Sequence, residues 1–167
     1  RVGEGGRPFQ LVKFRSMRTA SAGAQVTASG DARVTRVGEF LRKTKLDELP
    51  ELWNVVRGDL SLVGPRPEVP KYVDFESPRW REVLSVRPGI TDPMTIRLRH
   101  EEEILAGVQG DLETYYRETL LPEKLRGYIE YLRRRSAWSD LGVLFSTVFA
   151  IAHLTPSRSE GRRDDGA

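Results

Sequence analysis

The sequence predicts an α+β fold that is mostly helical, with short strands, in one compact domain. Apolar side chains recur at helical spacing through most of the chain, and only brief runs alternate as a half-buried strand would. The chain has 167 residues, 38% hydrophobic and 31% charged, which is typical of a folded protein with a sizeable core. We expect the domain to cover residues 1–154 and the polar tail, residues 155–167, to be disordered.

The first elements follow from local composition and a helix cap. Residues 9–17, "FQLVKFRSM", are apolar and basic by turns and predict a strand. The Gly/Ala/Ser-rich residues 20–32 predict a loop. Thr35 is then expected to cap a short helix that runs through Arg42.

A second helix is predicted for residues 47–57, with Gly58 as its stop signal. Four of its apolar side chains fall at i, i+3, i+4 and i+7, which predicts one buried stripe made of Leu49, Leu52, Trp53 and Val56. Residues 59–67, "DLSLVGPRP", follow as a short strand that enters a rigid turn, because two prolines and a glycine punctuate it.

The remaining chain has mainly helical patterns, with residues 87–93, "RPGITDP", as a loop. The predicted helices are residues 67–75, 78–86, 98–106, 111–120 and 122–135. Residues 137–154 form a further apolar helix that contains Asp140, and we expect it to be interfacial or buried.

Composition excludes several classes of chemistry. The chain has no cysteine, so it has no disulfide framework and no thiolate chemistry. His100 and His153 are far apart in the sequence, which disfavours a histidine metal cluster or a catalytic triad. The net charge of +3 and the pI near 9.4 suit anionic partners such as nucleotides, nucleic acid or acidic lipids.

The neighbouring carboxylates Asp47 and Glu48 are the main candidates for chemistry. From position alone, Asp47 is expected to be a helix N-cap and Glu48 a first-turn acid. Adjacent helical residues point about 100° apart, so the pair suits two separate tasks better than one shared proton. A carboxylate can attack phosphorus, and its neighbour can hold Mg²⁺. The basic residues just upstream, Arg42, Lys43 and Lys45, would balance a polyphosphate, or they form a solvated basic face.

Arg66 is flanked by Pro65 and Pro67, which restrict the backbone on both sides of it. A guanidinium presented with so little freedom suits a phosphate or nucleotide group. The alternative is a tight turn whose arginine makes a structural salt bridge.

Several long motifs in order resemble one known family. Residues 35–73, "TRVGEFLRKTKLDELPELWNVVRGDLSLVGPRPEVPKYV", closely resemble the core of the bacterial sugar transferases, the small monotopic polyprenyl-phosphate phosphoglycosyl transferases. Three further pieces agree: "GRPFQLVKFRSMR" upstream, and "VRPGIT" and "YLRRRSAWSDLGVLFSTV" downstream. The resemblance extends from Arg7 to about Ile151.

This resemblance implies a reaction and a set of roles. Such enzymes move a sugar-1-phosphate from a UDP-sugar to polyprenyl (undecaprenyl) phosphate and release UMP, which is the first membrane step of polysaccharide or glycoconjugate synthesis. By position, Asp47 would be the nucleophile that forms an aspartyl-phosphosugar intermediate, and Glu48 would hold the cofactor Mg²⁺. The resemblance assigns phosphate, uridine or lipid-phosphate contacts to Arg42, Arg66, Arg87 and Arg99, with Pro65 and Pro67 framing the site.

The chain departs from the family pattern in two places. After "PGIT" the commoner continuation is replaced by "DPMTIRLRHEEEIL", where only Arg99 keeps its place, and sugar choice is expected to be affected there. The acid of a later family segment is replaced by Tyr128. The re-entrant hydrophobic helix of the family is expected upstream of Arg1.

The residues themselves also indicate a membrane interface. Lys124, Arg126 and residues 133–135 precede the apolar helix, and basic residues beside an apolar surface helix suit an anionic leaflet. An ordinary core helix is the alternative. With the family resemblance, we expect a membrane-associated catalytic domain with amphipathic interfacial helices, on the cytoplasmic face of the bacterial inner membrane. A homo-oligomer is left open.

Two other functions compete with the enzyme. Residues 35–58 could form a helix-turn-helix that binds DNA, but Asp47, Glu48 and Glu51 would repel phosphates there, so no nucleic-acid partner is expected. A catalytically inactive membrane scaffold of the same fold is the other alternative, and the intact pair of carboxylates argues against it.

Overall fold

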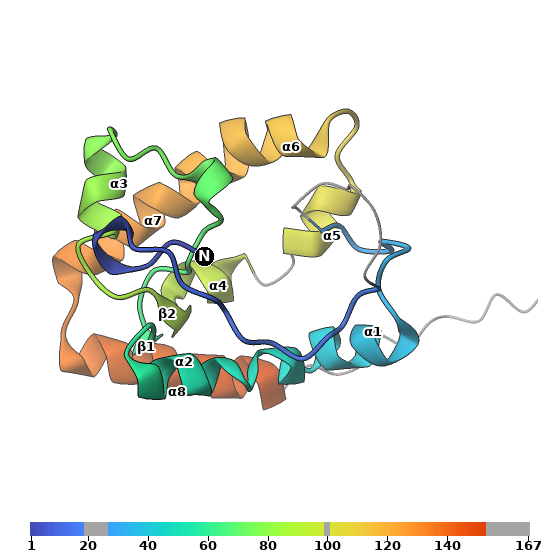
Figure 1. Ribbon diagram of the computed structural model, residues 1–167, viewed down its shortest axis with the longest axis horizontal. Helices are drawn as coiled ribbons and strands as arrows, with labels where there is room; N and C mark the ends of the chain where they lie inside the picture. The colour runs from blue at the N-terminus through green and yellow to red at the C-terminus, as the bar shows by residue number, and fades with distance from the viewer. Residues whose placement is uncertain (19–26, 99–100, 153–167) are drawn as a thin grey trace, which may run out of the picture.

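The computed structural model describes residues 1–18, 27–98 and 101–152. It is mostly helical with one small sheet, as the sequence predicts (Figure 1). The α-helices are α1 (Arg36–Lys43), α2 (Glu51–Arg57), α3 (Pro78–Val83), α4 (Pro93–Arg97), α5 (Glu101–Ala106), α6 (Leu112–Tyr115), α7 (Leu121–Arg134) and α8 (Ala137–Ala152). The short 3₁₀ turns are η1 (Glu4–Gly6), η2 (Leu46–Glu48) and η3 (Pro70–Tyr72), and η4 (Tyr116–Leu120) is a π-helical stretch.

The sheet has two parallel strands, β1 (Ser61–Val63) and β2 (Gly89–Thr91), with Ser61 opposite Gly89. The strand β1 was predicted, but β2 falls where a loop was expected, because its three residues are too few to show an alternating pattern. The crossover between the two strands contains η3 and α3.

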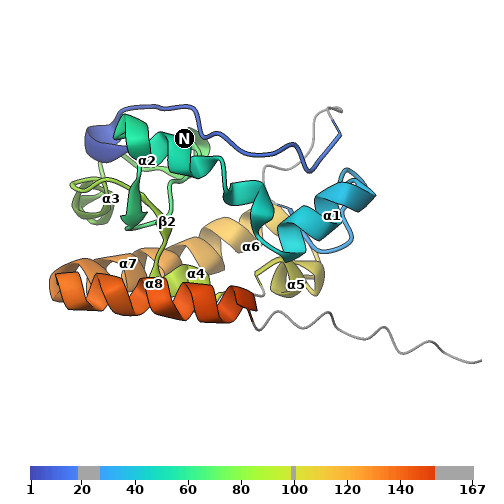
Figure 2. The same ribbon diagram turned by 90° about the horizontal axis from the view of Figure 1, so that it is seen from below.

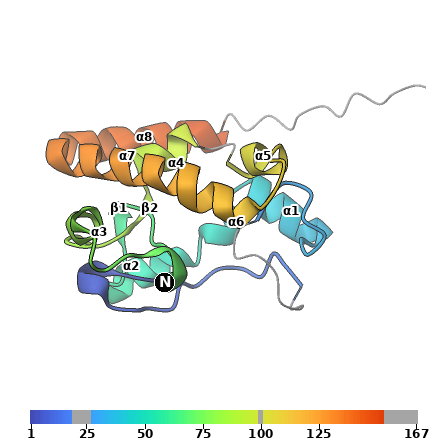
Figure 3. The same ribbon diagram turned by 90° about the horizontal axis from the view of Figure 1, so that it is seen from above.

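The core forms around α7, which packs against α3 and α4 and continues directly from η4. Figures 1 and 3 show α7 between α3 and α8. The buried side chains of this core include Trp80, Met94, Leu120, Leu125 and Tyr128. Helix α8 is fixed to the sheet by a 2.7 Å hydrogen bond between the hydroxyls of Thr147 and Thr91.

Most helix ends agree with the sequence. Thr35 caps α1 by accepting a 2.9 Å hydrogen bond from the Gly38 amide, and Gly58 ends α2 in the left-handed conformation. The predicted helix 98–106 differs, because Asp92 caps a separate helix, α4, and α5 begins only at Glu101. Only η3 forms within residues 67–75.

The predicted strand at residues 9–17 is wrong. This segment is extended but lies in no sheet, and Met17 makes only an isolated bridge to Val34. Its amides are used elsewhere: Val12 donates to Asn54 Oδ1 at 3.0 Å and Phe14 donates to the Asp47 carbonyl at 3.0 Å. The segment is therefore held against η2 and α2 by single contacts rather than by a ladder.

The predicted buried stripe on α2 is also wrong. Trp53 is 58% exposed and Val56 77% exposed, and Leu49 and Leu52 are about half exposed. The opposite face of α2 is buried instead and carries the polar residues Glu51 and Asn54. Helical periodicity had correctly located an apolar face, but that face points outward.

Exposed apolar side chains gather on three helices that lie along one side of the molecule. Figure 1 places α1, α2 and α8 along its lower edge, and Figure 2 looks at this side. We call the exposed apolar side chains of these helices, together with Leu49 just before α2, the apolar face; they are Val37, Phe40, Leu49, Leu52, Trp53, Val56, Trp138, Leu141, Phe145, Val148, Phe149 and Ile151. None of the helices that the structure describes is long and apolar enough to cross a membrane.

The basic residues that precede α8 lie in different places, and Arg135 pairs with Asp140 of α8 at 3.0 Å. Lys124 is buried, where its ammonium contacts Glu101 Oε1 at 2.8 Å. Arg126, Arg133 and Arg134 lie instead beside α3. Residues 155–167 and Arg99 lie outside the described residues, as does most of the predicted loop 20–32.

Candidate active site

The candidate nucleophile Asp47 lies in η2, between α1 and α2. Lys45, which precedes η2, adopts φ 57°, and this left-handed residue turns the chain sharply after α1. Asp47 is buried, and within the described parts of the chain its Oδ1 has no hydrogen-bond partner. Its expected role as an N-cap is wrong, because neither η2 nor α2 has a side-chain cap. A buried carboxylate oxygen without a partner is available for chemistry.

Burial raises the pKa of Asp47 above its ordinary value, and the nearby cations Lys13, Lys45 and Arg42 oppose part of this rise. Arg42 lies in the last turn of α1 and is half-buried, and its positive charge lowers the pKa of Asp47. The expected contact of Arg42 with a phosphate, uridine or lipid-phosphate group stays a prediction.

Glu48 is held between two cations. Its Oε1 accepts hydrogen bonds from Lys13 Nζ at 2.9 Å and from the Arg66 guanidinium. Burial by itself would raise the pKa of Glu48, but Arg66 and Lys13 outweigh it and the pKa lies well below its ordinary value. Glu48 is therefore a carboxylate throughout the physiological pH range.

Lys13 and Glu51 complete this cluster, and no sequence motif predicts a catalytic or binding role for either. Lys13 Nζ lies 3.0 Å from Glu51 Oε1, so one ammonium serves two acids. Burial raises the pKa of Glu51, while Lys13 and Arg66 oppose the rise. In the sequence, Lys13 is one of several basic residues in a strand-like run. Its contact with Glu48, 35 residues further along the chain, shows that it belongs to the cluster.

Arg66 is presented by a closely packed turn. Pro65 and Pro67 are buried, and the Gly89 amide donates to the Pro65 carbonyl at 2.9 Å. Gly64 and Gly89 pass so closely that a Cβ on Gly89 would lie 2.1 Å from the Gly64 nitrogen. No side chain fits there, so the backbone before Arg66 is fixed by the sheet as well as by the prolines.

The structure does not bring every predicted arginine to this cluster. Arg87 is exposed and forms an ion pair with Glu4 at 3.4 Å, on the N-terminal segment. Arg99 is outside the described residues. Tyr128, which replaces a family acid, is almost fully buried in the core, and burial raises the pKa of its hydroxyl.

The residues of this cluster fit a magnesium ion only in part. Among the described residues, no group of three or more acidic or histidine side chains is arranged to hold a metal. Within the described chain, however, Glu48 Oε2 makes only a long 3.5 Å contact with Arg66 Nη1, so one carboxylate oxygen is available. Mg²⁺ is often bound by one or two carboxylates together with substrate phosphates and water, and this site suits that arrangement.

A family model described as bacterial sugar transferase matches residues 1–153. The chain belongs to this family. The match spans the carboxylate cluster, the turn that presents Arg66 and the apolar face. The helix-turn-helix alternative has no support in the structure. The exposed side of α2 is apolar, whereas a recognition helix would present polar and basic groups there.

Three curated relatives match most of this chain. A Caulobacter vibrioides protein named UDP-glucose:undecaprenyl-phosphate glucose-1-phosphate transferase is 40% identical over 153 residues, covering 89% of this chain and 53% of its own length. An Aeromonas hydrophila protein named UDP-N-acetylgalactosamine-undecaprenyl-phosphate N-acetylgalactosaminephosphotransferase is 38% identical, covering 90% of this chain and 34% of its own. An Escherichia coli UDP-glucose:undecaprenyl-phosphate glucose-1-phosphate transferase is 35% identical, covering 89% and 31%.

The chain spans about half the length of the first of these relatives and about a third of the others. Their printed names differ in the sugar but share undecaprenyl phosphate as the acceptor.

Proposed function

We propose that this chain transfers a sugar-1-phosphate from a UDP-sugar to polyprenyl phosphate, with release of UMP. The observation that carries the proposal is the buried Asp47, whose Oδ1 has no partner among the described residues, next to a Glu48 that two cations hold ionised. Family membership and the names of the relatives support the same reaction.

The first step uses Asp47 as a nucleophile. An Asp47 carboxylate oxygen attacks the phosphorus that carries the sugar, the bond between that phosphorus and the bridging oxygen breaks, and UMP leaves with the electron pair. The product is an acyl phosphate between Asp47 and the sugar phosphate. Because burial raises the pKa of Asp47, this step slows as the pH falls through that raised value.

In the second step a phosphate oxygen of polyprenyl phosphate attacks the same phosphorus, and Asp47 leaves as a carboxylate. This regenerates the site and gives a polyprenyl diphosphate sugar. Arg66, fixed by its turn, orients phosphate oxygens, and Lys13 keeps Glu48 and Glu51 in place. When bound at Glu48, Mg²⁺ supplies positive charge that neutralises the diphosphate.

The apolar face rests on the cytoplasmic leaflet of the bacterial inner membrane. Its exposed side chains on α8 recur at Trp138, Leu141, Phe145 and Val148, one helical stripe, and α2 adds Trp53 and Val56. Each large apolar side chain moved from water to lipid contributes about 1.5–3 kcal/mol. A domain that lies on the bilayer in this way can accept a lipid-bound phosphate without spanning the membrane.

The test is UMP release in detergent with polyprenyl phosphate and a panel of UDP-sugars, which also identifies the sugar. Asp47→Asn is expected to abolish turnover, because a carboxamide is a far weaker nucleophile towards phosphorus. Asp74→Asn makes the same chemical change at an exposed position and is expected to leave turnover unchanged. Normal UMP release by Asp47→Asn would exclude the proposed role.

A further inference from the structure

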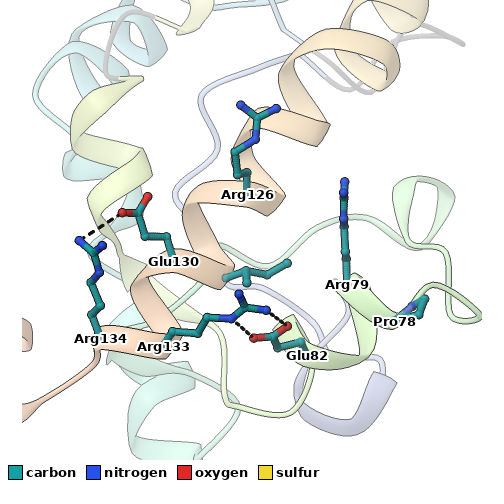
Figure 4. Close-up of a pocket in the computed structure, with 8 residues that line it drawn as sticks. Pro78, Arg79, Glu82, Arg126, Glu130, Arg133 and Arg134 are labelled. Carbon is teal, nitrogen blue, oxygen red and sulfur yellow. Dashed lines mark hydrogen bonds and ion pairs between the residues drawn. The ribbon is translucent and has the colours of Figure 1, made fainter.

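A basic groove lies between α3 and α7, outside the carboxylate cluster (Figure 4). Its volume is about 600 Å³. Helix α7 lines it with five residues between Arg126 and Arg134 that fall at i, i+3, i+4, i+7 and i+8, a single helical face, and α3 lines it with Pro78, Arg79 and Glu82.

The acidic residues of the groove are already paired. Glu82 accepts two hydrogen bonds from Arg133, at 3.1 and 3.3 Å, across the two helices. Glu130 pairs with Arg134 at 3.3 Å along α7. Four arginines and two glutamates line the groove, so two positive charges are left unbalanced.

The unbalanced charges belong to Arg79 and Arg126. Neither has an ion pair or hydrogen bond within the described chain, and both side chains are exposed. Figure 4 shows them extending in the same direction, away from the Glu82–Arg133 pair, from opposite helices. Ile129 adds an apolar, partly buried surface to the wall of the groove.

We propose that this groove binds the phosphoryl group of a soluble anion, bridged by Arg79 and Arg126. A guanidinium presents a planar fork that matches phosphate oxygens, and two forks from neighbouring helices suit one phosphoryl or diphosphoryl group. The volume falls in the range of small-molecule sites, and the apolar wall accommodates an organic portion.

The position of α7 favours a soluble anion over a lipid headgroup. Helix α7 lies between α3 and α8 in Figures 1 and 3, so the groove is on the side of α7 away from α8. If α8 rests on the bilayer, the groove faces the cytoplasm. The preference for a soluble anion over a lipid headgroup depends on the membrane placement proposed above, whereas the binding of a phosphoryl group does not.

The test is calorimetric titration of the full chain with inorganic pyrophosphate, in which the difference between the unchanged protein and a variant that lacks both arginines reports binding in the groove. The double variant Arg79→Gln/Arg126→Gln is expected to bind pyrophosphate at least tenfold more weakly than the unchanged protein. Arg81→Gln removes the same charge from the same helix, outside the groove, and is expected to bind normally. Equal binding by the double variant and the unchanged protein overturns the proposal.

Two further measurements separate this site from others. UMP release by the double variant is expected to be unchanged. Anion binding in the groove is therefore tested separately from the proposed transferase reaction. Sedimentation with phosphatidylcholine vesicles, with and without phosphatidylglycerol, is expected to be the same for the double variant and the unchanged protein. Loss of phosphatidylglycerol-dependent binding with pyrophosphate binding intact would overturn the assignment to a soluble anion.

Discussion

Removing the ammonium of Lys13 tests the carboxylate cluster without any assumption about the reaction. Lys13 lies 2.9 Å from Glu48 and 3.0 Å from Glu51, and the Glu51 side chain is only 2% exposed. Lys13→Met keeps the apolar stem but leaves Glu51 without its contacting cation, whereas Glu48 retains Arg66. We expect a loss of about 3 kcal/mol, at the low end for breaking a buried ion pair, because the Lys13 side chain is itself 28% exposed.

The pH dependence of this loss gives a second check. The folded-state pKa of Glu51 is already raised, and removal of Lys13 raises it further. A carboxyl group with a raised folded-state pKa destabilises the fold when it is ionised and ceases to do so when it is protonated. The penalty of Lys13→Met is therefore largest near neutral pH and above, and shrinks as the pH is lowered from about 8 to about 5.

The assay is thermal and urea unfolding of the unchanged protein and of Lys13→Met at each pH. A loss of about 3 kcal/mol corresponds to a fall of roughly 6–12 °C in the melting temperature of a domain of this size. Adding Glu51→Gln to the variant removes the unpaired charge and is expected to recover much of the loss. A penalty under about 1 kcal/mol, or one that does not change with pH, would refute this account of the cluster.

Three further predictions concern the packing, the turn and the apolar face. Gly38→Ala places a Cβ 1.9 Å from the Ser16 carbonyl oxygen, so it is expected to destabilise the fold by about 2 kcal/mol in urea unfolding although alanine favours helices; a stabilised variant would contradict this. Arg66→Lys keeps the charge near Glu48 but loses the fork, and we expect the KM for the UDP-sugar to rise about tenfold with little change in the unfolding midpoint; an unchanged KM would refute that role. Trp53→Glu is expected to weaken sedimentation with phosphatidylglycerol vesicles at least about tenfold while leaving stability nearly unchanged, because the side chain is 58% exposed; undiminished binding would place the bilayer elsewhere.

The sequence predicts best those features of the fold that depend on neighbouring residues, such as the ends of helices. The Thr35 cap, the Gly58 stop and the proline-opened helix α3 depend on neighbouring residues, and the structure contains all three. The strand at residues 9–17 was wrong because a strand needs a partner, and these amides bind Asn54 and the Asp47 carbonyl instead.

The outward face of α2 shows a more general limit. Helical periodicity identifies an amphipathic helix, but it does not say whether the apolar side meets a protein core or another environment. Here the polar side is buried because Asn54 donates to the Gln10 carbonyl at 2.8 Å and Glu51 pairs with Lys13. Those partners lie some 40 residues away in the sequence, beyond the reach of any local pattern.

The sequence predicts those residues of the candidate site that lie together in one motif. It does not predict the residues that folding brings in from other segments. Asp47, Glu48 and Arg66 stand in one long motif, and the structure brings Glu48 and Arg66 into contact beside Asp47. Lys13 belongs to another segment, and nothing in its surroundings marked it as the cation shared by two acids. Arg87 was assigned by resemblance alone and lies with Glu4 at the surface.

Covalent trapping at Asp47 tests the central claim most directly. The full chain is mixed with a labelled UDP-sugar in the absence of polyprenyl phosphate, quenched and digested, and the modified residue is located by mass spectrometry. We predict a phosphosugar adduct on Asp47, lost on addition of polyprenyl phosphate and absent from Asp47→Asn. A preparation that releases UMP in the full reaction yet never carries label on this aspartate would contradict the account.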